Sequence, residues 1–259
     1  MSLTGRVRGP VSCLVFCSVV WLVSGHEVDA EIFTVDPSQS VLSLSGVLMA
    51  PGVALPVESQ LPGSLTTHLQ GTIEANRDLP GFIAFPGGSH ITALPHPGGF
   101  LPGDVAADFA GVVEGILPGV DAYGALRDIE FDLVAGPEPI GAGGDFHVFD
   151  MVLEFLGGQF DLVADGLFDD SSSVAGFTAG NDTVVHGNLT QFGNNTVLTI
   201  PVDTQMFFAT SGFGLTLQLR AVGEIVSVVH LPEPATWLLL AIGAVGFVVV
   251  SSRYATIDA

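Results

Sequence analysis

Carboxylates in the second half of the chain are the side chains with the most obvious potential chemistry. Asp161, Asp165, Asp169 and Asp170 lie close together, and serines occupy positions 171–173. Oxygen-rich loops of this kind can bind calcium. The spacing of an EF-hand is absent, however, and a solvated acidic edge explains the run more simply. We retain Asp165, Asp169 and Asp170 as candidate calcium ligands.

Side chains for nucleophilic or zinc chemistry are sparse. Both cysteines, Cys13 and Cys17, lie near the start of the chain, so the part after residue 30 has no thiol. The histidines are scattered without a closely spaced pair, whereas a zinc site usually draws two ligands from short spacing. A Gly-x-Ser-x-Gly nucleophile elbow is also missing. The sequence therefore predicts a protein that is not an enzyme and holds no cofactor other than calcium.

The balance of charge limits the partners. The chain has 27 Asp and Glu against 6 Lys and Arg, which gives a formal net charge of −21. Such a surface repels nucleic acid, anionic lipid and acidic polysaccharide, and it attracts divalent cations or basic partners. Solubility outside the cell is the simplest reason for this charge. Nucleic acid is therefore not expected as a partner.

The elements that must position these side chains have the pattern of β-strands. Gly and Pro together supply 49 residues (33 plus 16) and divide the chain into short elements. Apolar and polar side chains alternate over residues 65–75 and 214–229, which sorts them onto two faces of a strand. Residues 129–133 alternate too, and the pattern places the carboxylates of Glu130 and Asp132 outward. Strands that are wet on one face are typical of antiparallel sheets.

The number of these strands predicts the fold class. About a dozen strands at short spacing favour an all-β, antiparallel meander that forms a single barrel-like or two-layer sandwich domain. We place this domain at residues 31–231. A repeat of fixed period, as in a solenoid, is not evident.

Glycines, prolines and polar residues predict several local features. Residues 81–85 and 90–94 are expected to form a hairpin. Residues 105–119 are the segment that best fits a short helix. Pro201 predicts that its strand lies at a sheet edge or ends early. Four further segments are expected to be turns or loops, namely residues 95–104, 141–144, 157–158 and 169–173.

The start of the chain has the features of an export signal. A positive region with Arg6 and Arg8 precedes an apolar stretch at residues 11–23, which is too short to span a membrane comfortably. Small residues follow at the offsets of a cleavage site. We therefore expect a signal peptide at residues 1–30, cleaved after Ala30.

An uncharged apolar stretch lies near the end of the chain. Residues 235–252 follow Pro232-Glu233-Pro234 and precede Arg253. As a helix this stretch would reach about 27 Å, close to the apolar thickness of a bilayer. Prolines resist helix, so the helix should begin after the second proline. The sequence predicts a transmembrane helix at residues 235–252 within a C-terminal segment at residues 232–259.

This C-terminal arrangement resembles the PEP-CTERM sorting signal of exported bacterial proteins. By that resemblance Pro232, Glu233 and Pro234 would be the recognised motif, and Arg253 would be the charge that is retained in the cytoplasm. The resemblance implies recognition by an exosortase, a membrane protease, in an exopolysaccharide-producing bacterium. The family usually ends in a cluster of basic residues, whereas this chain has Arg253 alone before residues 254–259.

These features lead to one main functional hypothesis and two alternatives. The main hypothesis is an exported, non-enzymatic β-protein with a structural or adhesive role at the cell surface or in the extracellular matrix. It would pass through an intermediate anchored in the inner membrane, with exosortase and the membrane as partners and exopolysaccharide or matrix as a further partner. The alternatives are a lipocalin-like barrel that carries a small apolar ligand and a calcium-dependent carbohydrate-binding module.

Overall fold

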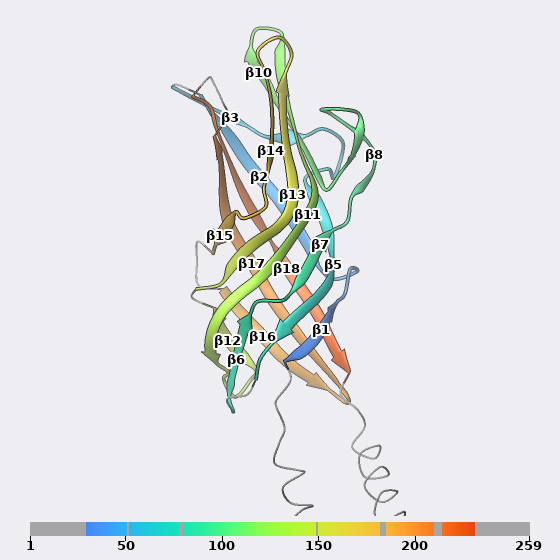
Figure 1. The fold of residues 1–259 in the computed structure, drawn as a ribbon, viewed down its shortest axis with the longest axis vertical. Helices are drawn as coiled ribbons and strands as arrows, with labels where there is room; N and C mark the ends of the chain where they lie inside the picture. Colours follow the sequence, from blue (N-terminus) through green and yellow to red (C-terminus); the bar gives the residue numbers. More distant parts are fainter. Residues whose placement is uncertain are drawn as a thin grey trace, which may run out of the picture. The chain divides into compact units, whose positions relative to one another are not determined.

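A computed structural model of the chain describes residues 30–50, 52–77, 80–148, 150–181, 185–209 and 214–230. The chain divides into two compact units, Met1–Ala30 and Glu31–Ala259, and the fold described below belongs to the second. Every regular element in the described residues is a β-strand (Figure 1). The predicted all-β fold class is therefore confirmed.

The described residues of the second unit form eighteen strands. The first nine are β1 (Glu31–Val35), β2 (Val41–Ala50), β3 (Val53–Pro56), β4 (Glu58–Ser59), β5 (Thr66–Ala75), β6 (Phe82–Pro86), β7 (His90–Ala93), β8 (His96–Phe100) and β9 (Val105–Ala107). The others are β10 (Phe109–Leu117), β11 (Val120–Pro139), β12 (Asp145–Val148), β13 (Val152–Ala164), β14 (Phe168–Ser173), β15 (Thr178–Gly180), β16 (Val185–Phe192), β17 (Asn195–Ala209) and β18 (Thr216–His230).

Sixteen of these strands belong to one sheet, and β8 and β9 pair with each other. The longest path through the sheet runs β12-β16-β17-β18-β1-β5-β7-β11-β10-β4, with β13 to β15 joined through β11. All pairings between the strands are antiparallel. The expected antiparallel arrangement is thus present, but pairs such as β18 with β2 join strands far apart in sequence.

The pairings also link the end of β15 to β17, the third strand of this path. Beyond β15, which pairs with β13, Asn181 forms an isolated antiparallel bridge with Thr204 of β17. The hydroxyl of Thr204 donates to the carbonyl of Gly180 at 2.6 Å, and the amide of Asp203 donates to Oδ1 of Asn181 at 3.1 Å. These contacts connect β15 and β17, the two ends of the long route through β18, β5, β11 and β13.

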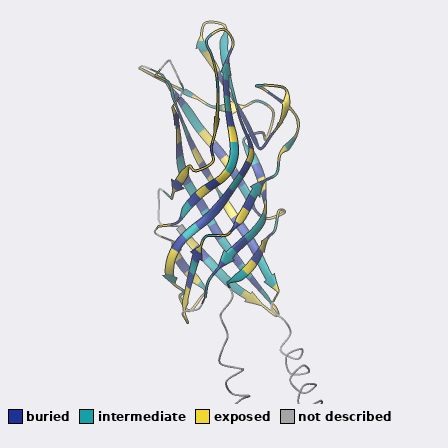
Figure 2. Cartoon of the chain, viewed as in Figure 1, coloured by how far each residue is buried: buried dark blue, intermediate teal, exposed yellow. Residues whose placement is uncertain are grey.

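One face of the sheet carries the hydrophobic core. Buried and exposed residues alternate along most strands (Figure 2), and the predicted alternation over residues 214–229 places Leu217, Leu219 and Ile225 of β18 in the core. Phenylalanines supply much of the bulk, because Phe33 and Phe131 are at most 1 % exposed. Burying an aromatic or aliphatic side chain of this size contributes about 1.5–3 kcal/mol.

The predicted hairpin between residues 81–85 and 90–94 is wrong. Strands β6 and β7 do not pair with each other; both pair with β11 and run along it in the same direction. Residues 87–90 form a bulge opposite two residues of β11, and Gly87 and Gly88 there have φ of 95° and 94°. Glycine takes these values without strain, so the Pro-Gly-Gly sequence bends one edge rather than reversing the chain.

Asp132 lies on the outer face as expected, opposite the exposed Glu154, but it is not exposed itself, because residues of the bulge cover its carboxylate. Asp132 is 7 % exposed. The amides of Gly88 and Ser89 donate to its two oxygens at 2.7 and 2.8 Å. Glu130, by contrast, is half-buried and pairs with His90, so only one of these two outward carboxylates reaches solvent.

Two segments that were expected to be loop and helix form strands. Residues 95–104 contain β8 and its turn toward β9, and residues 105–119 contain β9 and β10. Val112 and Val113 pair with Tyr123 and Ala122 of β11. The β-branched residues of this segment favour a strand, and pairing outweighs the weak helical periodicity.

Three further local expectations meet a mixed outcome. The turn expected at residues 141–144 is present. The turn at residues 157–158 is not, because β13 continues through Gly157 and Gly158, and residues 169–173 lie in β14 rather than in a loop. Pro201 does not end its strand. Strand β16 pairs with β17 only as far as Thr199, so no described strand pairs with β17 on that side at Pro201, which has no backbone N–H to donate.

Candidate functional site

Buried charge is concentrated beside one strand, β11. Among the described residues, three charged side chains are less than a tenth exposed: Asp108 at 1 %, Asp132 at 7 % and Arg127 at 9 %. Buried charges need partners, because removal from water disfavours the ionised form. Each of the three binds backbone groups that the sheet leaves unpaired.

Arg127 fixes the β8–β9 hairpin to β11. Its guanidinium donates to the carbonyls of Phe100 at 3.2 Å, Pro102 at 2.5 Å and Ala106 at 3.3 Å. Its Nε lies 3.4 Å from Oδ2 of Asp161 on β13. The planar fork of donors suits this task, because it binds several carbonyls and one carboxylate together. Asp161, first noted as part of an acidic run, is therefore an ion-pair partner.

Asp108 is the one carboxylic acid of this region with a raised pKa. Burial raises the pKa of Asp108 to about 6, and the neighbouring charge of Asp128 adds to this rise. The amide of Ile129 donates to its Oδ2 at 2.7 Å, which together with Arg127 opposes the rise in pKa. A perturbed acid often marks a catalytic site, but this carboxylate is sealed from solvent and contacts backbone.

The three calcium candidates lie on the β13–β14 hairpin. Asp165 lies in the turn, and Asp169 and Asp170 are neighbours on β14, opposite Val163 and Leu162. Successive side chains of a strand point to opposite faces. No group of three His, Cys, Asp or Glu in the described residues is placed to hold a metal ion.

One pair of side chains was missed by the sequence reasoning. His147 on β12 and His186 on β16 are direct partners across the sheet, with ring centroids 4.3 Å apart. They lie far apart in sequence, and only the strand register brings them together. Spacing along the chain therefore holds no signal for this pair.

Apolar space lies mainly at one end of the sheet. Within the core, two cavities measure about 30 and 20 Å³, which is room for little more than a water each. A larger cavity of about 220 Å³ lies where the β2–β3, β10–β11 and β13–β14 hairpins meet the start of β18. Its lining is entirely apolar: Leu48, Ala50, Leu55, Ile116, Leu117, Leu167, Phe168 and Leu215. We call this cavity the end pocket.

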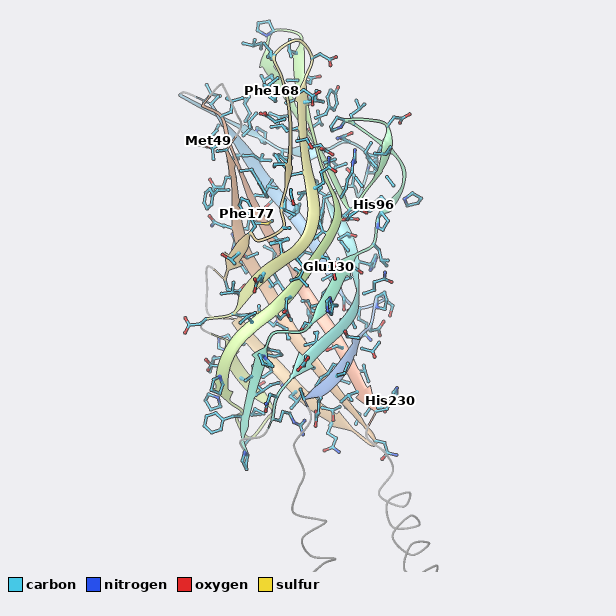
Figure 3. The ribbon with its side chains drawn as sticks, in the orientation of Figure 1. Met49, His96, Glu130, Phe168, Phe177 and His230 are labelled. Carbon is cyan, nitrogen blue, oxygen red and sulfur yellow. The ribbon has the colours of Figure 1, made fainter. Side chains whose placement is uncertain are left out.

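The end pocket lies far from the point where the described chain ends. Leu215 lines it just before β18 begins, whereas His230 is the last residue of β18. Fifteen residues of strand correspond to about 50 Å. Figure 3 shows Met49 and Phe168 toward one end of the sheet and His230 at the other.

A polar groove lies on the outer side of β10 and β11. It measures about 390 Å³ and is lined by Glu58, Ser59, Gln60, Leu61, Gly99, Leu101, Val112, Glu114, Asp121 and Tyr123. Gln60 forms it by joining the hairpin turn to the sheet: its amide donates to the carbonyls of Leu101 and Gly111 at 2.6 and 3.1 Å and accepts from the amide of Leu101 at 2.9 Å. Carboxylates and one tyrosine remain to face a ligand.

The residues assigned to sorting lie outside the described residues. This holds for Pro232, Glu233, Pro234, Arg253 and the expected helix at residues 235–252. It also holds for the signal peptide up to residue 29, and Ala30 begins the described part. In that part of the chain, no helix has the length and apolar character to cross a membrane.

Comparison with known proteins identifies the C-terminal segment. Residues 231–253 match the family described as the PEP-CTERM protein-sorting motif, which agrees with the resemblance of Pro232-Glu233-Pro234 and its apolar sequel. Neither a curated protein nor a solved structure matches the chain. The motif is a recognition signal for exosortase, a membrane protease, and it implies export through a membrane-anchored sorting intermediate. Residues 231–253 of the chain are therefore a PEP-CTERM sorting motif, which follows directly after the last described strand of an all-β unit.

Proposed function

We propose that this protein is a non-enzymatic β-domain that exosortase sorts to the cell surface or the extracellular matrix, where it has a structural or adhesive role. The observation that carries the proposal is the sorting motif at residues 231–253. It begins one residue after β18 ends at His230. No linker separates the motif from β18 in the sequence, so a membrane or partner that binds the C-terminal segment also keeps the sheet close to it.

The architecture that we propose for this domain is a closed barrel. The route of pairings from β17 through β18, β5, β11 and β13 returns to β17 at the Asn181–Thr204 bridge. Closure removes free sheet edges, which otherwise pair with other chains. Copies of a protein that are crowded at a surface are then less prone to pair their strands with one another, and they contact partners through side chains.

The polar groove is the surface that we assign to adhesion. Its carboxylates and the hydroxyl of Tyr123 can bind sugar hydroxyl groups, and an aromatic ring can pack against the apolar face of a sugar. The chain's charge of −21 disfavours acidic polymers. The proposed ligand is therefore a neutral polysaccharide of an exopolysaccharide matrix.

Cell fractionation tests the sorting step. Full-length protein is compared with a variant in which Pro232, Glu233 and Pro234 are all replaced by Ala, and Pro118→Ala at a β-turn serves as control. We expect the wild type and the control at the surface or in the medium, and the motif variant held in the membrane. Wild-type protein in the cytoplasm would refute the proposal.

Retention on matrix polysaccharide tests the adhesive role. We expect Tyr123→Ala to lower retention of the exported protein by about two- to tenfold, because the packing contacts of one aromatic ring contribute about 0.5–1.5 kcal/mol. Phe192→Ala removes an exposed ring outside the groove and should leave retention unchanged. If Tyr123→Ala and Phe192→Ala are retained equally, the groove is not the adhesive surface; the proposal on sorting does not depend on this result.

A further inference from the structure

The end pocket differs from the rest of the surface in having no polar side chain in its lining. Its eight lining residues are Leu, Ile, Phe and Ala, drawn from strands β2, β3, β10 and β14 and from the segments beside them. No side chain there can bond a polar group of a ligand, and an unpaired polar group in such a place costs free energy. The occupant must therefore enter with an apolar part.

Exposed apolar side chains surround the same hairpins. Met49 is 42 % exposed, Val53 is 53 % exposed, and Leu117 is 48 % exposed. Val53 pairs with the pocket residue Ala50, and Leu117 itself lines the pocket, whereas Met49 lies on the opposite face of β2. Apolar patches beside a cavity mark binding sites more often than isolated exposed residues do.

Charge decides which apolar molecules fit. Asp165 lies in the β13–β14 turn, two residues before the pocket residue Leu167. The fixed cations of the described residues are Arg77, Arg127 and Arg220, and each is paired with a carboxylate, namely Glu31, Asp161 and Asp203 respectively. An anionic head group at the pocket mouth would meet this carboxylate without a cation to offset it.

We infer that the end pocket binds the alkyl chain of an uncharged apolar molecule, such as a long-chain alcohol or a neutral lipid. The ligand is held about 50 Å along β18 from the residue where the sorting motif begins. The polar end of the ligand stays in solvent at the mouth. This goes beyond the proposed function, because it requires neither sorting nor the polar groove.

Photolabelling of the whole chain tests this inference. The probes are a twelve-carbon primary alcohol and the matching carboxylate, each with a diazirine near the chain end, at pH 8. Mass spectrometry then maps the labelled residues, so that labelling of residues 235–252 is distinguished from labelling of the pocket. We expect the alcohol to label the residues around Leu55, Ile116 and Leu167, and the carboxylate to label them at least tenfold less.

Two variants and a control distinguish binding in the end pocket from non-specific labelling of apolar surface. Ala50→Trp fills the space with an apolar ring, and Leu167→Gln puts an amide into it; both should abolish most of the labelling. Leu156→Gln makes the same chemical change at an exposed site on β13 outside the pocket and should leave it unchanged. Labelling that is spread over the chain, that survives Ala50→Trp and Leu167→Gln, or that is equal for both probes would overturn the inference.

Discussion

Two neighbourhoods of the sheet are built in opposite ways. Strands β17 and β18 pair over fifteen consecutive positions, from Asn195 with His230 to Ala209 with Thr216, without a shift in register. Strand β11 pairs with β6, β7, β10 and β13, and its register shifts against three of them. The buried polar side chains follow this difference.

In the regular ladder the buried polar residues are uncharged. Those of β17 and β18 are Thr196, Thr204 and Ser227. Beside β11, three charged side chains are buried, and each binds backbone groups at an irregular position. A bulge removes backbone groups from the ladder, and buried backbone groups need another partner. We infer that these buried charged side chains bind backbone groups that strand pairing does not satisfy.

Replacing Arg127 should have the largest effect on stability. Arg127→Met keeps the length and apolar stem but removes the cation beside Oδ2 of Asp161 and the donor to three carbonyls. Breaking a buried ion pair from one side costs about 3–5 kcal/mol. We expect the midpoint of urea unfolding of the exported protein to fall accordingly. A loss below about 1 kcal/mol would show that the hairpin is held by other contacts.

Removing the carboxylate of Asp132 should have the next largest effect. Asp132→Ala leaves the amides of Gly88 and Ser89 unpaired in the bulge. Ser89 is buried whereas Gly88 is exposed and can bind water, so the loss should be about 1–3 kcal/mol, the cost of one buried unsatisfied group. Asp132→Asn keeps one oxygen and should recover about half of it. Thermal unfolding followed by circular dichroism gives both values, and equal melting temperatures for all three proteins would contradict the bulge's dependence on this acid.

Asp108 should make stability depend on pH in one direction. Its pKa is raised from 3.8 to about 6 in the folded protein, so the folded state binds its proton more tightly than the unfolded state. Its contribution is therefore complete below pH 3.8 and is lost as the pH rises through about 6. The loss amounts to about 3 kcal/mol at 1.36 kcal/mol per unit.

The matched comparison for this prediction is Asp108→Asn. The free energy of unfolding of the wild type minus that of Asp108→Asn should decrease as the pH rises from 4 to 7, and level off above. Urea titrations of both proteins at each pH give this difference. A difference that does not change with pH, or that increases, would mean that the carboxylate ionises normally.

The smallest effect is expected in the regular ladder. Arg220 makes two hydrogen bonds of 2.7 Å to Asp203, but half of its side chain is exposed. Exposed ion pairs contribute about 0.2–1 kcal/mol, so Arg220→Gln should lower the free energy of unfolding by no more than this. The same urea titration measures it. A loss as large as that of Arg127→Met would erase the distinction between the two neighbourhoods.

The sequence predicted the regular neighbourhood better than the irregular one. Alternation identified β5 and β18, because their side chains have simple inner and outer positions. It failed at Asp132, which a bulge covers on the outer face, and at Gly157-Gly158, where the strand continues through glycine. Periodicity describes ideal strands, and a bulge is recognisable only when the partner strand is known.

The candidate sites show the same limit. The presence of the sorting motif was predicted correctly, because its residues are contiguous and its chemistry is local. The end pocket and the polar groove were not predicted, since each combines residues from several strands that only the register brings together. The run at Asp165, Asp169 and Asp170 is contiguous as well, and its role as a calcium site stays a prediction.

The central claim is that the β-domain is cargo for export and sorting. Its most direct test is the intact mass of the protein recovered from producing cells after separation of cytoplasm, membranes and medium. If the β-domain is exported and sorted, the recovered chain begins at Glu31 and is found outside the cytoplasm. A chain that still begins at Met1 and stays in the cytoplasm would contradict it.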